Sequence, residues 1–322
     1  MQTPDKYKYT FTVFTPTLNR KNTLSRVYNS LCLQTFEDFE WLIVDDGSVD
    51  GTREMIARWT AEAEFPIRYY WQENQGKHIA FNSGVNLAQG RLFLTLDSDD
   101  GCVPEALAKF ILYWNAIPEN DRDNYSAVTA LCQDETGKLV GDRFPQNILD
   151  ADSLELRYRY KIRGEKWGFQ RTDILAKYPF PCIAGSKFVP EGIVWSAISR
   201  HYKTRFINEL LRIYYRNNST DSQEKLTTSG SPGKHANSLM YWHGTILTNE
   251  IGWFWHKPLH FVRSAIHYCR FTFHQKSSIS AAIKKLEVPS AMLLCIMVLP
   301  ASWFVYCRDL RLDKKTMIKS SE

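Results

Sequence analysis

The chain has 322 residues, enough for one large α/β domain and an extension, and its hydrophobic share of 44% is that of a globular protein. A net charge of +5 is too small and too dispersed to indicate nucleic acid as a partner. Seven cysteines without a C-x-x-C pair argue against a disulfide framework or a zinc site and indicate a reducing compartment. Residues 1–10 are polar and resemble no signal peptide, so we expect the catalytic part in the cytosol.

The first hundred residues alternate between strand and helix patterns. Aromatic and β-branched residues predict strands over 11–15, 39–44, 67–71 and 92–96. Apolar residues at helical spacing predict helices over 24–31, 55–59 and 79–88 between them. This order predicts an α/β fold, with a parallel sheet covered by helices on both faces. Ligands bind outside the carboxyl ends of the strands in such sheets.

Carboxylates follow two of these strands. The strand over 92–96 ends in three carboxylates within four positions, and the strand over 39–44 ends in two. Crowded carboxylates are costly to bury unless a cation joins them, and oxygen ligands suit Mg²⁺ or Mn²⁺. The pattern predicts a divalent metal site, whereas a plain helix N-cap before Pro104 is the alternative. The residues concerned are Asp45, Asp46, Asp97, Asp99 and Asp100.

The second half of the chain is less regular. We expect a strand over 125–131 and a strand that passes into a short helix near Thr172. Basic residues alternate with apolar ones over 157–163, which predicts a strand with one basic face. That face is either solvated or a wall beside a diphosphate or an anionic acceptor. Residues 217–234 are rich in Ser, Thr, Asn and Gly and predict a mobile loop.

Four ordered motifs resemble the family 2 inverting glycosyltransferases, which use nucleotide sugars and have the GT-A fold. They are FTPTLNR at 14–20, VDDGSVDGT at 44–52, NQGKHIAFNSG at 74–84 and LDSDD at 96–100. The resemblance covers residues 9 to about 102 and extends more loosely to about 216. It implies a mostly parallel central sheet, with helices on both faces, ahead of a helical C-terminal extension.

The resemblance implies a nucleoside pocket at the ends of the first two strands. Thr15, Pro16 and Thr17 would line it. Asp46 would meet the uracil edge, and Asp45 would support Asp46.

The resemblance also implies a diphosphate site. Asp97, Ser98 and Asp99 match the D-x-D motif, which in the family binds the ribose and the diphosphate-bound metal, with Asp99 as the direct ligand. Lys77 could reach a phosphate. His78 is either a further contact or a surface histidine at a helix start. The residues that match the segment beside the nucleotide are Asn74, Gly76, Lys77 and Asn82.

A late acidic motif of the family supplies the catalytic base, and Glu191 in 189–192 is its match here. The Gln-x-x-Arg-Trp motif of processive synthases is missing, so one sugar per encounter is expected. The implied partners are a nucleotide-sugar donor and a glycan or glycolipid acceptor, without nucleic acid. Two other interpretations are a sugar nucleotidyltransferase and a non-catalytic module that binds membrane or nucleic acid.

The C-terminal third is apolar, aromatic and basic. Residues 288–306 are nineteen positions with almost no polar side chain, close to the roughly twenty that span a bilayer. Pro300 favours a kinked or interfacial helix. Residues 251–276 combine aromatic with basic side chains, which suits an anionic headgroup region. We expect peripheral or monotopic attachment to the inner face of the cell membrane, the alternative being a core-packing extension or an oligomer interface. The expected division is 1–216, 217–250 and 251–322.

Overall fold

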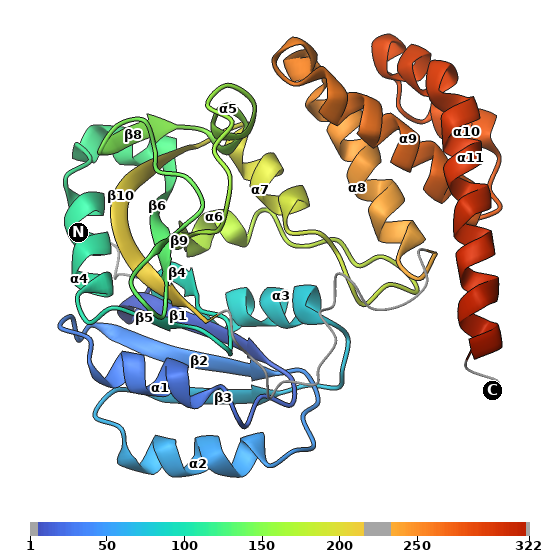
Figure 1. Ribbon diagram of the computed structural model, residues 1–322. Helices are drawn as coiled ribbons and strands as arrows, with labels where there is room; N and C mark the ends of the chain where they lie inside the picture. The colour runs from blue at the N-terminus through green and yellow to red at the C-terminus, as the bar shows by residue number, and fades with distance from the viewer. Residues whose placement is uncertain (1–5, 216–232, 320–322) are drawn as a thin grey trace. The chain divides into compact units, whose positions relative to one another are not determined.

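The computed structural model describes residues 6–215 and 233–319, the last seven by their backbone alone. The chain forms two compact units (Figure 1). The first comprises residues 1–180 and 194–221, and the second comprises residues 181–193 and 222–322.

The described residues of the first unit form ten strands with helices between them. The strands are β1 (Tyr9–Thr17), β2 (Phe39–Asp45), β3 (Ile67–Trp71), β4 (Gly90–Thr95), β5 (Gly101–Cys102), β6 (Tyr125–Asp134), β7 (Leu139–Val140), β8 (Ile148–Ala151), β9 (Lys166–Arg171) and β10 (Lys203–Tyr214). The helices are α1 (Ser25–Cys32), α2 (Thr52–Glu62), α3 (Lys77–Leu87), α4 (Ala106–Asn115), the 3₁₀ helix η1 (Glu119–Asn124), α5 (Ser153–Tyr158) and α6 (Thr172–Leu175). Helix α7 (Gly192–Ser199) begins with two residues of the second unit and continues in the first.

The strands form one sheet in the order β3-β2-β1-β4-β9-β6-β10-β5, with β7 beside β6 and β8 beside β10. Strands β3, β2, β1 and β4 are parallel, and β6 is parallel to β10. Strand β9 runs antiparallel between β4 and β6. The predicted mostly parallel sheet is therefore confirmed. The carboxyl ends of β1, β2 and β4 lie at one edge of the sheet.

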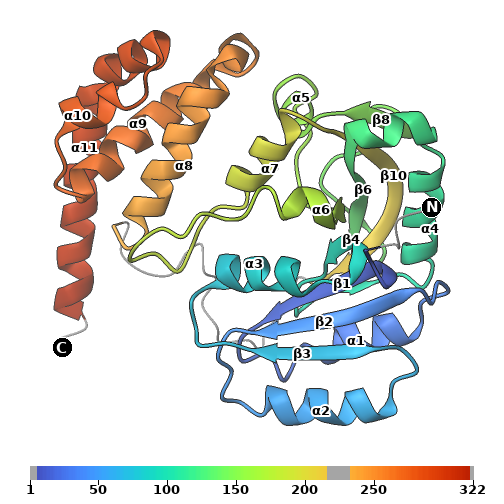
Figure 2. The same ribbon diagram turned by 180° about the vertical axis from the view of Figure 1, so that it is seen from behind.

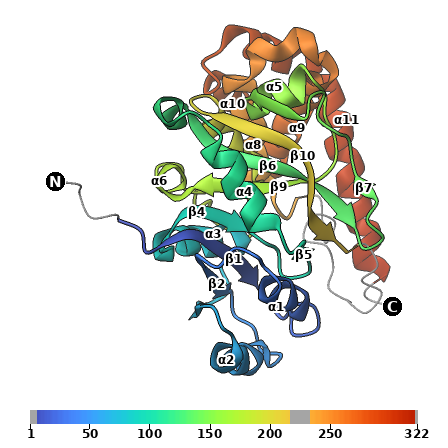
Figure 3. The ribbon, with the colours of Figure 1, turned by 90° about the vertical axis from the view of Figure 1, so that its left-hand side faces the viewer.

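Helices cover both faces of this sheet, as predicted. Phe11 and Val13 of β1 point to the face that α1, α2 and α4 cover. Phe14 points to the opposite face, where its ring lies 5.7 Å from that of Phe81 on α3. Helix α1 lies in front of the strands in Figure 1 and behind them in Figure 2. Figure 3 shows α4 crossing β9 and β6.

The predicted basic strand over 157–163 is wrong. Residues 153–158 form helix α5, because the carboxylate of Asp152 accepts hydrogen bonds from the amides of Leu154 and Glu155 at 2.8 Å and caps the helix. Arg159 then pairs with Glu155 at 2.7 Å, one turn apart. The basic residues therefore do not form one wall.

The second unit is helical. Its elements are α8 (Ala236–Asn249), the 3₁₀ helix η2 (Ile251–His256), α9 (Pro258–His274), α10 (Ile279–Lys284) and α11 (Pro289–Lys319). Helix α9 lies between α8 and α11 (Figure 1). Part of α11, Pro289–Leu312, is long and apolar enough to cross a membrane by length and composition. The predicted mobile loop falls largely on 216–232, outside the described residues, whereas α8 lies within the predicted connecting segment.

Candidate active site

Asp45 closes the turn that follows β2. The buried carboxylate accepts hydrogen bonds from the Ser48 amide and from the Tyr69 hydroxyl, both at 2.8 Å. Burial and the bond to Asp45 raise the pKa of Tyr69. Gly47 in this turn has a φ of 97°, and a Cβ there would lie 3.2 Å from the backbone nitrogen of Asn74. The turn therefore requires glycine for its backbone conformation and for the close passage of the neighbouring loop.

Asp46 orders the loop between β3 and α3. Its carboxylate accepts hydrogen bonds from the Gln72 side chain at 2.8 Å and from the amides of Gln75 and Gly76 at 2.9 and 2.8 Å. Three of about four acceptor positions are thus in use. Asp46 is held rigidly and has room for one further donor, such as a ligand N–H.

The acidic turn after β4 is bound by two cations. Asp97 pairs through Oδ1 with Lys77 Nζ at 2.9 Å and through Oδ2 with Arg212 Nη2 at 3.1 Å. Burial alone would raise the pKa of Asp97, but Lys77 and Arg212 hold it at about 2. Both oxygens of Asp97 are therefore engaged by side chains of the protein.

Arg212, on β10, is a site residue that the sequence analysis missed. Its Nε donates to Asp100 at 2.9 Å, and its Nη2 contacts the same carboxylate closely. Burial raises the pKa of Asp100, with Asp99 and Asp97 adding to the rise and Arg212 opposing it. The three neighbouring carboxylates of the acidic turn indicate that a cation lies close to them. The sequence does not identify that cation as Arg212.

Asp99 differs from its two neighbours. It is half-buried, and within the described part of the chain no hydrogen bond or ion pair engages its carboxylate, while its carbonyl oxygen accepts from Arg26 at 3.0 Å. No cluster of three or more His, Cys, Asp or Glu side chains among the described residues could hold a metal alone. Mg²⁺ and Mn²⁺ are often held by one or two carboxylates together with substrate phosphates. Asp99 fits that kind of site.

The predicted nucleoside loop forms the end of β1. Thr15 and Thr17 are buried, and the Thr15 hydroxyl accepts from Trp41 Nε1 at 2.9 Å. The buried Thr17 hydroxyl has no hydrogen-bond partner among the described residues. Pro16 lies between them, and Ser98 is buried in the acidic turn. Thr17 pairs in register with Asp45, so the two motifs lie side by side.

Helix α3 begins with Lys77 and the neighbouring His78. His78 is 4% exposed, so its interpretation as a surface histidine is wrong. Burial lowers the pKa of His78 against the opposing effect of Asp46, and its Nδ1 has no partner among the described residues. Asn82, one turn later, bonds through both amide atoms to the backbone of Phe180 at 2.9 Å. Asn82 therefore positions the chain at Phe180.

Glu191 belongs to the second unit and immediately precedes α7. Its side chain is exposed at the start of an apolar helix. A carboxylate is chemically able to act as a general base.

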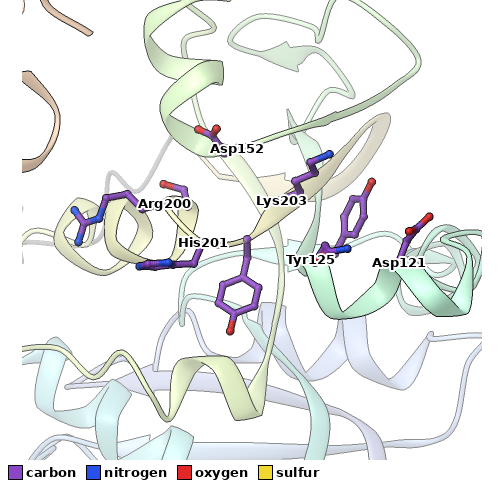
Figure 4. Close-up of a pocket in the computed structure, with 9 residues that line it drawn as sticks. Asp121, Tyr125, Asp152, Arg200, His201 and Lys203 are labelled. Carbon is purple, nitrogen blue, oxygen red and sulfur yellow. The ribbon is translucent and has the colours of Figure 1, made fainter. Parts of the chain in front are cut away.

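A cavity of about 500 Å³ lies elsewhere on the first unit (Figure 4). It opens where β6 and β10 begin, which is the sheet edge away from the carboxyl end of β4. The cavity contains none of the predicted site residues. Its lining is Asp121, Asn124, Tyr125, Asp152, Ser199, Arg200, His201, Tyr202 and Lys203.

Comparisons with known proteins bear on this arrangement. The profile of glycosyl transferase family 2 matches residues 12–177. An uncharacterized glycosyltransferase of Nostoc is 41% identical over 88 residues, which are 27% of each chain. The GalNAc(5)-diNAcBac-PP-undecaprenol beta-1,3-glucosyltransferase of Campylobacter jejuni is 23% identical over 304 residues, covering 89% of this chain and 93% of that one. The structure of S. aureus TarS 1–349 with UDP-GlcNAc is similar at a TM-score of 0.62 and 17% identity, covering 96% of this chain and 92% of that one.

The mostly parallel sheet with helices on both faces is a GT-A-like fold. Because the family profile matches half of the chain, the chain belongs to glycosyl transferase family 2 and is a glycosyltransferase. This match favours the glycosyltransferase over the nucleotidyltransferase and over the non-catalytic module. The chain spans about a quarter of the Nostoc relative and of a Rickettsia conorii relative, at 27% and 26% of their lengths.

Proposed function

We propose that the chain transfers one sugar from a UDP-sugar to a hydroxyl of a lipid-linked glycan, with inversion at the anomeric carbon. The observation that carries the proposal is the acidic turn at the carboxyl edge of the sheet. Lys77 and Arg212 engage Asp97, whereas the Asp99 carboxylate has no partner in the described structure. The Asp99 carboxylate is therefore suited to hold a divalent metal ion that also binds a diphosphate.

The donor nucleoside would bind at the ends of β1 and β2. Buried polar atoms are normally hydrogen-bonded, yet Thr17 Oγ1 and His78 Nδ1 have no partner among the described residues. Asp46 can accept one more N–H, which a uracil ring offers at N3. UDP is further supported by the UDP-GlcNAc in the TarS structure.

The charges of the turn suit a cation-assisted diphosphate. Asp97, Asp99 and Asp100 carry three negative charges when ionised. Lys77 and Arg212 pair with Asp97 and Asp100, and Arg26 donates to the carbonyl oxygen of Asp99. The Asp99 carboxylate, which forms no ion pair within the described residues, would repel a diphosphate unless a divalent ion lay between them. Asp99 would hold Mn²⁺ or Mg²⁺ with the donor phosphates, and the ion would act as a Lewis acid for the leaving group. Asp97 would orient the ribose.

The acceptor hydroxyl would attack the anomeric carbon and lose its proton to the Glu191 carboxylate. The bond to the diphosphate oxygen breaks as the new C–O bond forms, and the diphosphate leaves with the electron pair. Lys77, 38% exposed at its side chain, would stabilise the charge that develops there.

A lipid-linked acceptor is supported by two features. The Campylobacter relative, named for an undecaprenol-linked substrate, aligns over most of this chain. The second unit contains the apolar helix α11. We place the reaction at the cytoplasmic face of the cell membrane, in the synthesis of a surface polysaccharide.

Calorimetric titration of UDP with and without Mn²⁺ tests the donor site. We expect metal-dependent binding that Asp99→Asn weakens at least about tenfold, the loss of one charge-assisted interaction. Asp121→Asn, at an exposed carboxylate of η1, is the matched control and should bind as the wild type does.

Three outcomes would contradict the proposal: no binding of UDP to folded protein, binding unaffected by metal, or equal loss in the Asp121 control. If UDP binds as expected, turnover is measured over a panel of UDP-sugars with an undecaprenyl-diphosphate glycan as the acceptor. Transfer to a free sugar but not to the undecaprenyl-diphosphate glycan would leave the donor assignment intact and overturn the assigned acceptor.

A further inference from the structure

One face of helix α11 is apolar and exposed. Side chains that recur every three or four residues share one face of a helix. From Leu293 to Phe304 this face contains no charged side chain, and it extends over about 17 Å at 1.5 Å per residue. The members with exposed fractions of 54–70% are Leu293, Ile296, Met297, Trp303 and Phe304.

The 3₁₀ helix η2 extends this apolar face. A cavity of about 400 Å³ lies between η2 and α11, with Phe254 on one side and Leu293 and Met297 on the other. Trp255, which also lines the cavity, is 85% exposed, and Leu259 at the start of α9 is 76% exposed. Contiguous apolar surface of this kind marks an interaction site.

Cations border the apolar face. Arg308 and Arg311 are exposed and continue the same line of α11, four and seven residues after Phe304. Lys284 and Lys285 at the end of α10 are exposed as well. Residues 250–312 contain eight Lys or Arg and three Asp or Glu. An apolar face bordered by cations is complementary to a bilayer with anionic headgroups.

The opposite face of α11 is buried against α9. The carboxylate of Asp309, 1% exposed, accepts from His274 at 3.0 Å and is in close contact with Arg270. Earlier along both helices, the thiol of Cys269 lies 3.9 Å from the carbonyl oxygen of Cys295. A membrane-spanning α11 would therefore bring α9 with it, including the exposed Arg263. Charged side chains in the hydrocarbon core are costly.

We propose that α11 lies in the plane of the membrane and that its exposed face, with η2, binds an anionic bilayer surface. This inference rests on the membrane location given in the proposed function and specifies how the protein binds that membrane. It does not depend on sugar transfer. The apolar side chains would enter the headgroup boundary, and Arg308 and Arg311 would pair with lipid phosphates.

Flotation of the full chain with sealed vesicles tests the surface. We expect binding to vesicles of phosphatidylcholine with phosphatidylglycerol, and weaker binding to phosphatidylcholine alone. The double variant Met297→Glu/Phe304→Glu should lose about tenfold or more in partitioning, because two apolar contacts become charged. Leu112→Glu on α4, where Leu112 is 64% exposed, is the matched control and should float as the wild type does.

The arginine pair gives a second, independent variant. Arg308→Gln/Arg311→Gln should lose about thirtyfold on anionic vesicles, at about 1 kcal/mol per charge, and nothing on neutral ones. A wild type that does not float, or an equal loss in Leu112→Glu, would overturn the proposal. Membranes that retain the protein after alkaline carbonate would indicate a spanning helix and contradict the in-plane arrangement.

Two further results separate this inference from its alternatives. If the glutamate variant turned an oligomer into a monomer while vesicle binding stayed unchanged, the apolar face would bind a second copy of the chain. UDP binding is measured on the same variants without lipid and should be unaffected. Failure of UDP binding in the wild type would overturn the proposed donor site and leave the membrane surface standing.

Discussion

Arg212 and Asp100 form a buried pair that joins the last long strand of the sheet to the acidic turn. The Arg212 side chain is 9% exposed and the Asp100 side chain 2% exposed, with Nε 2.9 Å from Oδ2. The same guanidinium reaches Asp97 at 3.1 Å. A buried cation that bonds two carboxylates fixes the turn, so the carboxylate of Asp99 is presented by a rigid frame.

Arg212→Gln should destabilise the fold and weaken UDP binding. Removal of one partner of a buried ion pair costs about 3–5 kcal/mol, because the remaining charge stays buried. Without Arg212 the acidic turn also loses the hydrogen bonds that hold Asp97 and Asp100 in place. We therefore expect the UDP affinity of the folded fraction to fall at least about tenfold. Urea denaturation and calorimetry measure the two effects separately.

Arg205→Gln provides the matched control for this prediction. Arg205 lies on the same strand and makes a bidentate pair with Asp150 at 2.9 and 2.8 Å, away from the acidic turn. This variant should also lose stability, yet it should bind UDP as the wild type does. Equal losses of UDP affinity in both variants would mean that Arg212 acts only through global stability.

The stability of the protein should depend on pH through Asp97. Its pKa in the folded protein is about 2, lower than the ordinary 3.8. A lowered carboxyl pKa stabilises the fold above the ordinary value, and the stabilisation is lost as the pH falls from about 4 to about 2. The contribution is about 2 kcal/mol at most.

Urea denaturation across this pH range checks the prediction. Asp97→Asn should flatten the acid limb of the stability curve, whereas Asp121→Asn on η1 should keep the wild-type slope. An unchanged acid limb in Asp97→Asn would show that the pairs with Lys77 and Arg212 do not set the titration of this group.

Gly47→Ala should disturb the turn that joins Asp45 to the neighbouring loop. The φ of 97° is strained for alanine, and the new Cβ would lie 3.2 Å from the nitrogen of Asn74. We expect a loss of about 1–2 kcal/mol in unfolding free energy and a weaker UDP affinity.

Gly185→Ala separates backbone strain from steric contact. Gly185 has a φ of 72°, but no atom lies within 4 Å of a Cβ placed there. It should lose stability by strain alone and leave UDP binding unchanged. If Gly47→Ala bound UDP normally, the close passage of Asn74 would be unimportant for the nucleotide.

The N-terminal half of the sheet could be predicted because its signals are local. Apolar runs bounded by turn residues predicted the bounds of β1 to β4 to within a few positions. Because β2 and β4 both pair in parallel with β1, Asp46 and Asp97 lie at the same edge of the sheet. Parallel strands place their carboxyl ends at the same edge of a sheet, so the prediction of the individual strands is enough to expect the two carboxylates there.

The rest of the site could not be predicted because it depends on partners distant in sequence. Arg212 lies 112 residues from Asp100, in β10, a strand that the sequence analysis did not predict. The 157–163 stretch has period-two alternation, yet the cap at Asp152, followed by Glu155, favours a helix. Asn82 matched a nucleotide-binding motif, but its amide is engaged by Phe180, 98 residues away.

Glu191→Gln should separate chemistry from donor binding. Glutamine keeps the size and exposure of the side chain at the start of α7 but cannot accept the acceptor proton. A positioned base contributes about 10²–10⁴-fold, so we expect kcat to fall by that factor while the Kd for UDP stays within about twofold. The control is Glu119→Gln at an exposed carboxylate of η1, which should retain full turnover. A Glu191→Gln enzyme with wild-type kcat would place the base elsewhere. A variant with slow turnover and equally weakened UDP binding would make Glu191 a residue that holds the donor.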